Sequence, residues 1–251
     1  MDIHVEQKQN TKEKIVMANF YLNIKNMCRS EGASLTGTAS YICGQTLRDS
    51  YDGNVHRYKR NDVLYRHIFL PEGAPEEFRN LQNLCDRLEQ AEVRRDARTA
   101  RYMIGALPNE LPLYELSRIV REYVQANFVA YGLCVVVAIH EGRNEDEPQK
   151  NNPHVHMLVS TRTVDGRGLN KKKDREHNRR MYLLAWRKEW MLVQNRAYER
   201  NGMDIRVSHE RLKVQNIWNH EPVKYLSRLE WERKHRESPG RHCQIEMERS
   251  R

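Results

Sequence analysis

The chain has 251 residues, of which 39% are hydrophobic and 31% are charged, with a formal net charge of +9 and a pI near 9.3. This length suits one large domain, or one domain with a helical extension, and the basic balance favours a polyanionic partner. The five cysteines lack Cys-x-x-Cys spacing. Their scatter argues against a disulfide framework and a thiolate zinc site. The absence of a signal peptide or a membrane-length apolar run predicts a cytoplasmic protein without membrane insertion.

The N-terminal part is predicted to contain a leader and one strand. Residues 1–16 are polar and aperiodic, which predicts a flexible leader ahead of an alternative start at Met17. Apolar and polar residues then alternate from Phe20 to Ile24, as expected for a strand. Residues 28–32 are predicted to form a turn.

A helix of small residues is predicted from Ser34 to about Leu47. Its apolar stripe consists of Leu35, Ala39 and Ile42, which are spaced at i, i+4 and i+7. Tyr41 lies well around the helix from this stripe, so its hydroxyl is a candidate nucleophile. Spacing alone favours an ordinary half-buried tyrosine, because the chain has 12 tyrosines and chemistry by itself does not single out this one.

The middle of the chain alternates between predicted strands and helices. Val63 to Leu70 is predicted to be a strand. A long helix follows, with a stripe over residues 81–91 and a heavily charged continuation from Glu89 to Arg101. Residues 106–111 break this pattern and are predicted to form a short strand. A strongly amphipathic helix over residues 116–128 ends near Gly132.

Two apolar runs and three histidines carry the clearest chemical signal. The run Cys134–Ile139 ends at His140, and a polar loop from Glu141 to Pro153 leads to a second run that contains His154 and His156. In a strand these last two side chains share one face. Antiparallel pairing would bring His140 across to them. A lone histidine is more often a surface or packing residue, but three converging imidazoles are typical of a metal site.

Downstream residues add positive charge and a long helix. A turn is predicted over residues 164–168. A basic patch suited to phosphate contacts contains Arg162, Lys171, Lys172, Lys173 and Arg175. A helix is predicted from about Met181 to Arg200, then a short extended segment over residues 204–208 and a helical region that frays into a basic tail.

The order of these motifs resembles the MobA/MobL plasmid mobilisation relaxases, which belong to the HUH endonucleases. The resemblance rests on Tyr41-Ile42, on Ala-Leu-Pro-Asn-Glu-Leu at 106–111, on Ala-Ile-His at 138–140 and on Asn-Pro-His-Val-His-Met-Leu at 152–158. It covers roughly residues 17–228. Residues 40–44 are close to the family's tyrosine segment but are not its commonest form.

The resemblance implies an α+β fold, with an antiparallel sheet of about five strands, helices packed on one face and an open face that carries the metal. We therefore expect a leader over 1–16, a relaxase domain over 17–228 and a basic helical or disordered tail over 229–251. No helicase or primase segment follows, so a relaxase domain alone or a minimal protein is expected.

The resemblance also implies specific roles. Tyr41 would attack a DNA phosphate at a nick site, giving a 5′-phosphotyrosine link and a free 3′-hydroxyl. His140, His154 and His156 would hold a divalent ion, Mn²⁺ or Mg²⁺, and Glu110 matches an acidic residue near the site. The partners implied are single-stranded DNA at a plasmid transfer origin, accessory relaxosome proteins and a conjugative coupling protein.

Three alternatives remain open at the level of the sequence. An HUH replication initiator or transposase would share the ion site and differ in its DNA. A histidine-triad nucleotide hydrolase would require a third alternating histidine where this chain has Leu158. A non-catalytic basic DNA-binding protein would leave DNA unprocessed whether or not Tyr41 is replaced.

Overall fold

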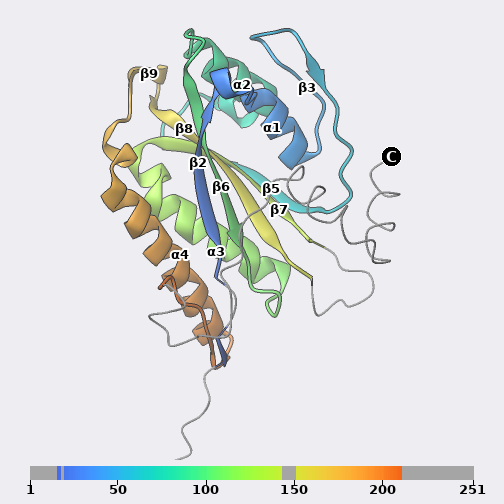
Figure 1. Ribbon diagram of the computed structural model, residues 1–251, viewed down its shortest axis with the longest axis vertical. Helices are drawn as coiled ribbons and strands as arrows, with labels where there is room; N and C mark the ends of the chain where they lie inside the picture. Colours follow the sequence, from blue (N-terminus) through green and yellow to red (C-terminus); the bar gives the residue numbers. More distant parts are fainter. Residues whose placement is uncertain (1–15, 18–19, 143–150, 211–251) are drawn as a thin grey trace, which may run out of the picture. The chain divides into compact units, whose positions relative to one another are not determined.

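The computed structural model describes residues 16–17, 20–142 and 151–210 (Figure 1). Its centre is an antiparallel sheet, whose strands lie in the order β2 (Leu22–Cys28), β6 (Arg98–Ala106), β8 (His154–Asp165), β7 (Leu133–His140) and β5 (Val63–Phe69). A sixth strand, β9 (Gly168–Lys173), pairs antiparallel with the far end of β8. The predicted α+β fold with an antiparallel sheet is therefore confirmed.

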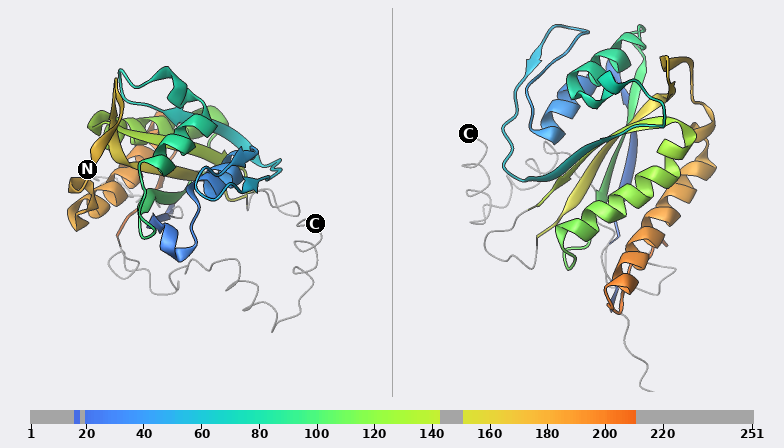
Figure 2. Two further views of the ribbon diagram at one scale, coloured as in Figure 1. Left: turned by 90° about the horizontal axis from the view of Figure 1, so that it is seen from above. Right: turned by 180° about the vertical axis from the view of Figure 1, so that it is seen from behind.

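Helices α3 (Leu113–Asn127) and α4 (Arg180–Arg200) cover one face of this sheet (Figure 2). Alternation along β8 explains the packing, because Val155, Met157 and Val159 all point to this side and join its core. A Cβ atom at Gly105 of β6 would lie 2.7 Å from the indole of Trp190. The missing side chain at Gly105 thus allows α4 to lie close against the sheet.

The second face is also partly covered, by α1 (Leu35–Cys43) and α2 (Leu81–Gln90). Helices were expected on one face only, but they also pack on the second face. The reason is that β7 and β8 place apolar residues such as Val136 and Leu158 on that face as well. Helix α1 begins where the Ser34 hydroxyl accepts a hydrogen bond from the Gly37 N–H at 2.8 Å. It ends at Gly44, whose φ of 61° is left-handed, so it is shorter than the predicted 34–47.

The prediction of a charged helix running to Arg101 is wrong. Helix α2 ends at Gln90, and β6 lies between β2 and β8. Arg101 is only 2% exposed, and its guanidinium donates to the Ser160 carbonyl and to Asp174 Oδ2, each at 3.2 Å. A charge that is satisfied in this way can occupy a strand interior, which a local sequence pattern does not reveal.

Residues 107–111 form a turn and not the predicted short strand. The Leu107 N–H donates to the Pro153 carbonyl at 2.8 Å, which continues the link between the ends of β6 and β8 by one bond. Pro112 then precedes α3, in keeping with the preference for proline at the start of helices.

Short elements complete the part of the chain that the structure describes. Strand β1 (Val16–Met17) pairs with β10 (Ile205–Arg206), β3 (Leu47–Arg48) pairs with β4 (Val55–His56), and 3₁₀ turns occupy Arg29–Glu31, Glu76–Arg79, Val129–Tyr131 and Glu176–Asn178. Val16 is thus a strand residue, whereas the rest of the predicted leader, residues 211–228 and the predicted tail at 229–251 lie outside the described residues. Within the described residues, no helix has the length and apolarity needed to cross a membrane.

Candidate metal centre and nucleophile

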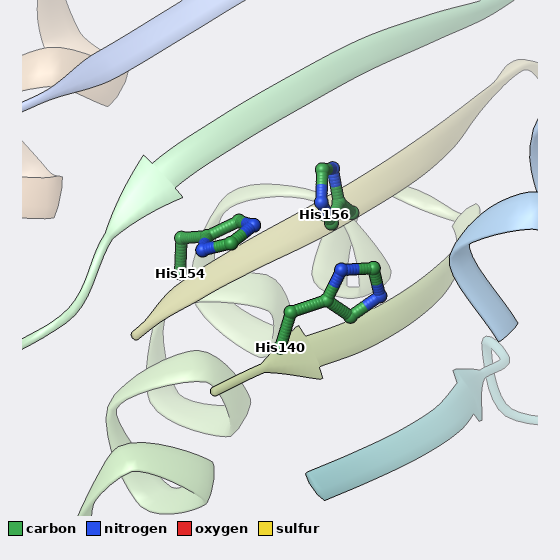
Figure 3. Close-up of side chains that lie close together, drawn as sticks. All are labelled: His140, His154 and His156. Carbon is green, nitrogen blue, oxygen red and sulfur yellow. The ribbon is translucent and has the colours of Figure 1, made fainter. Parts of the chain in front are cut away.

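Three histidines converge on the second face of the sheet, at one end of β7 and β8. His140 and His154 are direct partners across the two strands, and His156 follows on the same face of β8. One ring nitrogen from each residue lies within 4.8 Å of the others, and the ring centroids are 4.4 to 5.4 Å apart (Figure 3). The predicted meeting of the three imidazoles is confirmed, and their role as metal ligands stays a prediction.

Each imidazole is held from outside the cluster. His140 Nε2 donates a hydrogen bond to the Ile42 carbonyl, and His154 Nδ1 donates one to the Asn152 carbonyl, both at 2.8 Å. His156 Nδ1 lies 2.6 Å from the Tyr102 hydroxyl. Because a carbonyl oxygen only accepts, the first two bonds fix the tautomers and leave a lone pair on His140 Nδ1 and on His154 Nε2.

His140 Nδ1 is the informative atom of the cluster. It is buried and has no hydrogen-bond partner among the described residues, and Figure 3 shows a nitrogen of this ring turned toward the other two histidines. Buried polar atoms are nearly always paired. An unpaired acceptor that faces two further imidazoles therefore fits a divalent cation, which would accept the lone pairs.

Burial also keeps these rings neutral. It lowers the pKa of His140 to about 4 and that of His156 to about 2, and it lowers the pKa of His154 as well. Arg60 adds to each of these shifts through its positive charge. At neutral pH all three rings are consequently uncharged, as metal ligands must be.

The backbones of Gly142 and Asn152 meet just before His154. The Asn152 N–H donates to the Gly142 carbonyl at 2.9 Å, and Gly142 has a φ of 58°. A Cβ atom at position 142 would lie 2.1 Å from the Asn152 carbonyl oxygen, the same oxygen that orients His154. Only glycine is compatible with this approach.

Tyr41 lies on α1 with 42% of its surface exposed, whereas Leu35, Ala39 and Ile42 of the predicted stripe are buried. The phenol is therefore accessible, as a nucleophile must be. The helix end that carries it is fastened to the sheet, because the Ile42 carbonyl accepts from His140 and the Cys43 carbonyl accepts from Arg66 Nη1 at 3.0 Å. The first of these bonds places the residue after Tyr41 in contact with the histidine cluster.

Arg60 and Asp62 also belong to this site, and sequence reasoning missed them. The guanidinium carbon of Arg60 lies 4.4 Å from the centroid of the Tyr41 ring, and its Nε donates to Asp62 Oδ1 at 2.8 Å. Asp62 Oδ2 lies 3.9 Å from His140 Nδ1. The hydrogen bond from Arg60 lowers the pKa of Asp62 to about 2. No motif marks these two residues, because their proximity to Tyr41 and His140 arises only in the fold.

Glu110 is bonded to a helix on the opposite face of the sheet. The Tyr198 hydroxyl donates to Glu110 Oε2 at 3.0 Å, and Tyr198 belongs to α4, which packs on the opposite face of the sheet. Burial and the Glu110 carboxylate together raise the pKa of Tyr198. This contact ties the turn after β6 to α4, and the predicted role of Glu110 near the reacting groups stays a prediction.

The predicted DNA-binding residues lie toward the other end of β8. Arg162 Nε and Lys173 Nζ bind the two oxygens of the Glu92 carboxylate, at 2.8 and 2.7 Å. Lys171, Lys172 and Arg175 are exposed. Together with residues 91–94 and 96–98, the five predicted residues line a hollow of about 1090 Å³. The structure gathers the basic patch but separates it from the histidines along the strand.

Comparisons with known proteins agree on one family. A model of the MobA/MobL family matches residues 33–226. The chain is 37% identical, over 150 residues, to "Probable mobilization protein MobA" of Bifidobacterium longum, covering 59% of this chain and 26% of that protein. It is 29% identical to "Mobilization protein MobL" of Acidithiobacillus ferridurans, covering 84% of this chain and 62% of that protein. The chain thus spans only part of the length of these relatives.

A solved structure has a similar fold. The structure described as "Molecular Basis of Vancomycin Resistance Transfer in Staphylococcus aureus" superposes with a TM-score of 0.70 at 26% sequence identity. The match covers 77% of this chain and 100% of that chain.

Proposed function

The chain belongs to the MobA/MobL family, and from this premise we propose that it is a relaxase that nicks plasmid DNA at a transfer origin and later rejoins the strand. The observation that carries the proposal is that a buried His140 Nδ1, without a hydrogen-bond partner in the described part of the chain, lies near the helix end that carries the exposed Tyr41. The names of the relatives favour mobilisation over a replication initiator or transposase.

The three histidines would hold a divalent cation. Their neutral nitrogen donors suit Mn²⁺, and Mg²⁺ is the alternative occupant. When bound, the ion would stabilise the charge that builds on the non-bridging phosphate oxygens. Three protein ligands would leave positions free for the substrate.

Tyr41 would carry out the transesterification. Its hydroxyl oxygen forms the bond to phosphorus while the bond from phosphorus to the 3′ oxygen breaks. The phenol proton is lost to solvent or a base, and the leaving 3′ oxygen gains a proton, so the step is balanced. The phosphotyrosine link retains the energy of the broken ester, and reversal by the same 3′-hydroxyl reseals the strand without a nucleotide cofactor.

The DNA would reach the site as a single strand from its own replicon. The exposed cations Lys171, Lys172 and Arg175 are suited to contacts with the phosphate backbone, while Arg162 and Lys173 have an internal partner in Glu92. Accessory relaxosome proteins and a conjugative coupling protein are proposed partners, and the bacterial cytoplasm is the proposed place of action.

Labelled single-stranded DNA from the transfer origin tests the reaction. With Mn²⁺, the wild type is expected to form a covalent adduct that carries a 3′-end label, while a 5′-end label leaves on a fragment with a free 3′-hydroxyl. Tyr41→Phe removes the nucleophile and is expected to abolish the adduct. An adduct that carries the 5′ label instead would contradict the proposed polarity.

Two further tyrosines make the assignment specific. Tyr58 is 43% exposed and lies edge-on to Tyr41, so it is the natural competitor as nucleophile. Tyr114, 65% exposed on α3, is a matched control on the opposite face of the sheet, and Tyr114→Phe is expected to keep full activity. An adduct that survives Tyr41→Phe and disappears in Tyr58→Phe would reassign the reaction to Tyr58. If the wild type binds DNA without forming any adduct, the chain is a non-catalytic DNA-binding protein.

A further inference from the structure

Arg60 occupies a position between the tyrosine and the histidines. Its guanidinium carbon lies over the ring of Tyr41, 4.4 Å from the ring centroid. Its Nε and Nη2 form a two-pronged pair with Asp62, at 2.8 and 2.5 Å. Such a fork fixes the plane of the guanidinium as well as its position.

Asp62 is itself anchored beside the histidine cluster. Its carbonyl accepts a hydrogen bond from the Glu141 N–H at 2.9 Å, directly after β7, and its carboxylate lies 3.9 Å from His140 Nδ1. A continuous series of contacts thus runs from Tyr41 through Arg60 and Asp62 to His140. The series fixes the phenol relative to the cluster through side chains, in addition to the backbone bond at Ile42.

Tyr41 needs such support because it is exposed. A surface tyrosine samples several rotamers, and each alternative removes the hydroxyl from its reactive position. Here Arg60 lies against one face of the ring, and the Tyr58 ring packs at 90° with its centroid 5.4 Å away. A guanidinium over an aromatic ring is attractive, and the attraction grows where water is partly excluded.

We propose that Arg60 is a positioning residue for Tyr41, which holds the ring against the guanidinium and keeps a positive charge beside the hydroxyl. The inference rests on the proposed function, since it assumes that Tyr41 is the nucleophile. It assigns Asp62 the supporting task of orienting Arg60. Loss of the guanidinium is expected to slow the reaction while leaving DNA binding nearly intact.

The first test separates rate from binding. Single-turnover adduct formation is measured with saturating DNA and Mn²⁺, and the DNA dissociation constant is measured separately by anisotropy. Arg60→Ala is expected to lower the rate about 100-fold, the scale of a small misplacement of a reacting group, with a change in affinity of less than about threefold. Arg60→Lys is expected to be intermediate, because it keeps the charge and loses the planar fork. Millimolar guanidinium ion is expected to restore part of the Arg60→Ala rate.

Arg57 provides a matched control. It is an exposed arginine three residues earlier in the same segment, and Arg57→Ala is expected to leave the rate unchanged. If Arg60→Ala weakens DNA affinity as much as it slows the reaction, Arg60 is a DNA contact and the positioning role is excluded. Failure of both guanidinium ion and lysine to restore any rate would also exclude it.

A second test does not depend on activity. In protein labelled with 3-fluorotyrosine, the ¹⁹F resonance that disappears in Tyr41→Phe reports the surroundings of this ring. That resonance is expected to move in Arg60→Ala and to stay in place in Arg57→Ala. An unchanged resonance would overturn the proposal even if activity falls. Conversely, if the wild type forms no adduct, the proposed function fails while the ¹⁹F result still decides whether Arg60 positions the ring.

Discussion

The two ends of strand β8 differ in whether their buried and half-buried polar groups are paired with one another. At one end Arg162 binds Glu92, and Glu92 also receives Lys173, so each charge at this point has a partner. At the other end His154 and His156 turn nitrogen atoms toward His140, whose Nδ1 has no partner among the described residues. Both ends belong to one strand with one alternation of side chains.

This contrast separates stability from chemistry. Removing one partner of a buried charge pair costs several kcal/mol, because the remaining charge is left without compensation. Buried lone pairs that face one another cannot satisfy each other, because each needs a hydrogen-bond donor or a cation. A buried polar group therefore does not mark a functional site by itself. It does so when no other group of the protein pairs with it.

The largest expected effect is the loss of metal binding at the histidine end. His140→Ala removes one of the three proposed ligands and is expected to abolish Mn²⁺ binding. The expected loss of affinity exceeds the roughly 10- to 100-fold that follows from removing an outer-shell partner. Titration calorimetry measures it. His67→Ala, which alters an exposed histidine of β5, is the control and is expected to bind Mn²⁺ like the wild type. Equal Mn²⁺ affinities in the two variants would show that His140 is not a metal ligand, and the two ends of β8 would then not differ as described.

Removal of Glu92 tests the opposite end. Glu92→Ala leaves Arg162 and Lys173 without their shared carboxylate and is expected to lower the free energy of unfolding by about 3 kcal/mol. Urea denaturation measures this, and Mn²⁺ affinity is expected to stay unchanged. Glu176→Ala is a suitable control because Glu176 is exposed and its ion pair with Arg179 lies on the surface. A stable Glu92→Ala protein would show that the basic end is not held together as described.

Acidification should affect the histidine end selectively. The pKa values of His140 and His156 lie at about 4 and about 2 in the folded protein, below the value of about 6.5 for an unfolded histidine. Below pH 6.5 the unfolded chain takes up protons that the folded state refuses, so stability falls as pH falls. Between pH 7 and 5 the metal-free protein is expected to lose about 2 kcal/mol of stability for each of His140 and His156.

Urea denaturation of the metal-free protein at several pH values measures this dependence. His156→Asn is expected to flatten the slope most. His67→Asn is expected to flatten it less, because burial lowers the pKa of this more exposed imidazole by a smaller amount. An unchanged slope in His156→Asn would mean that this imidazole is not held neutral by the fold.

The smallest expected effect concerns the exposed cations. Replacing Lys171 and Lys172 together by alanine is expected to leave stability unchanged. The slope of log affinity for single-stranded DNA against log salt is expected to fall by about 1.4, as for two lost phosphate contacts. Lys173→Ala is the informative comparison, because it breaks a bond to Glu92 and should reduce stability more than DNA affinity. The reverse pattern would assign Lys173 to the DNA.

Periodicity predicted much of this molecule. The runs that became β7 and β8 and the stripes of α3 and α4 are strong local patterns, and the three histidines followed from strand alternation plus antiparallel pairing. Strand β6 was not predicted, because Arg98 and Arg101 gave its sequence the look of a charged helix. The groups that bind the Arg101 guanidinium come from β8 and from residues 174–178, which are distant in the sequence. Arg60 was not predicted for a related reason. Its partner Asp62 is close in the sequence, but Tyr41, over whose ring it lies, is not.

Gly142 shows how far the influence of a residue without functional groups can extend. Any side chain at position 142 would collide with the carbonyl oxygen of Asn152. Because that oxygen sets the tautomer of His154, the collision would turn the His154 imidazole. A mutational scan would consequently score this glycine as though it belonged to the reaction chemistry. The sensitivity of Gly142 to substitution would reflect the orientation of the His154 ring and not a contact between Gly142 and DNA.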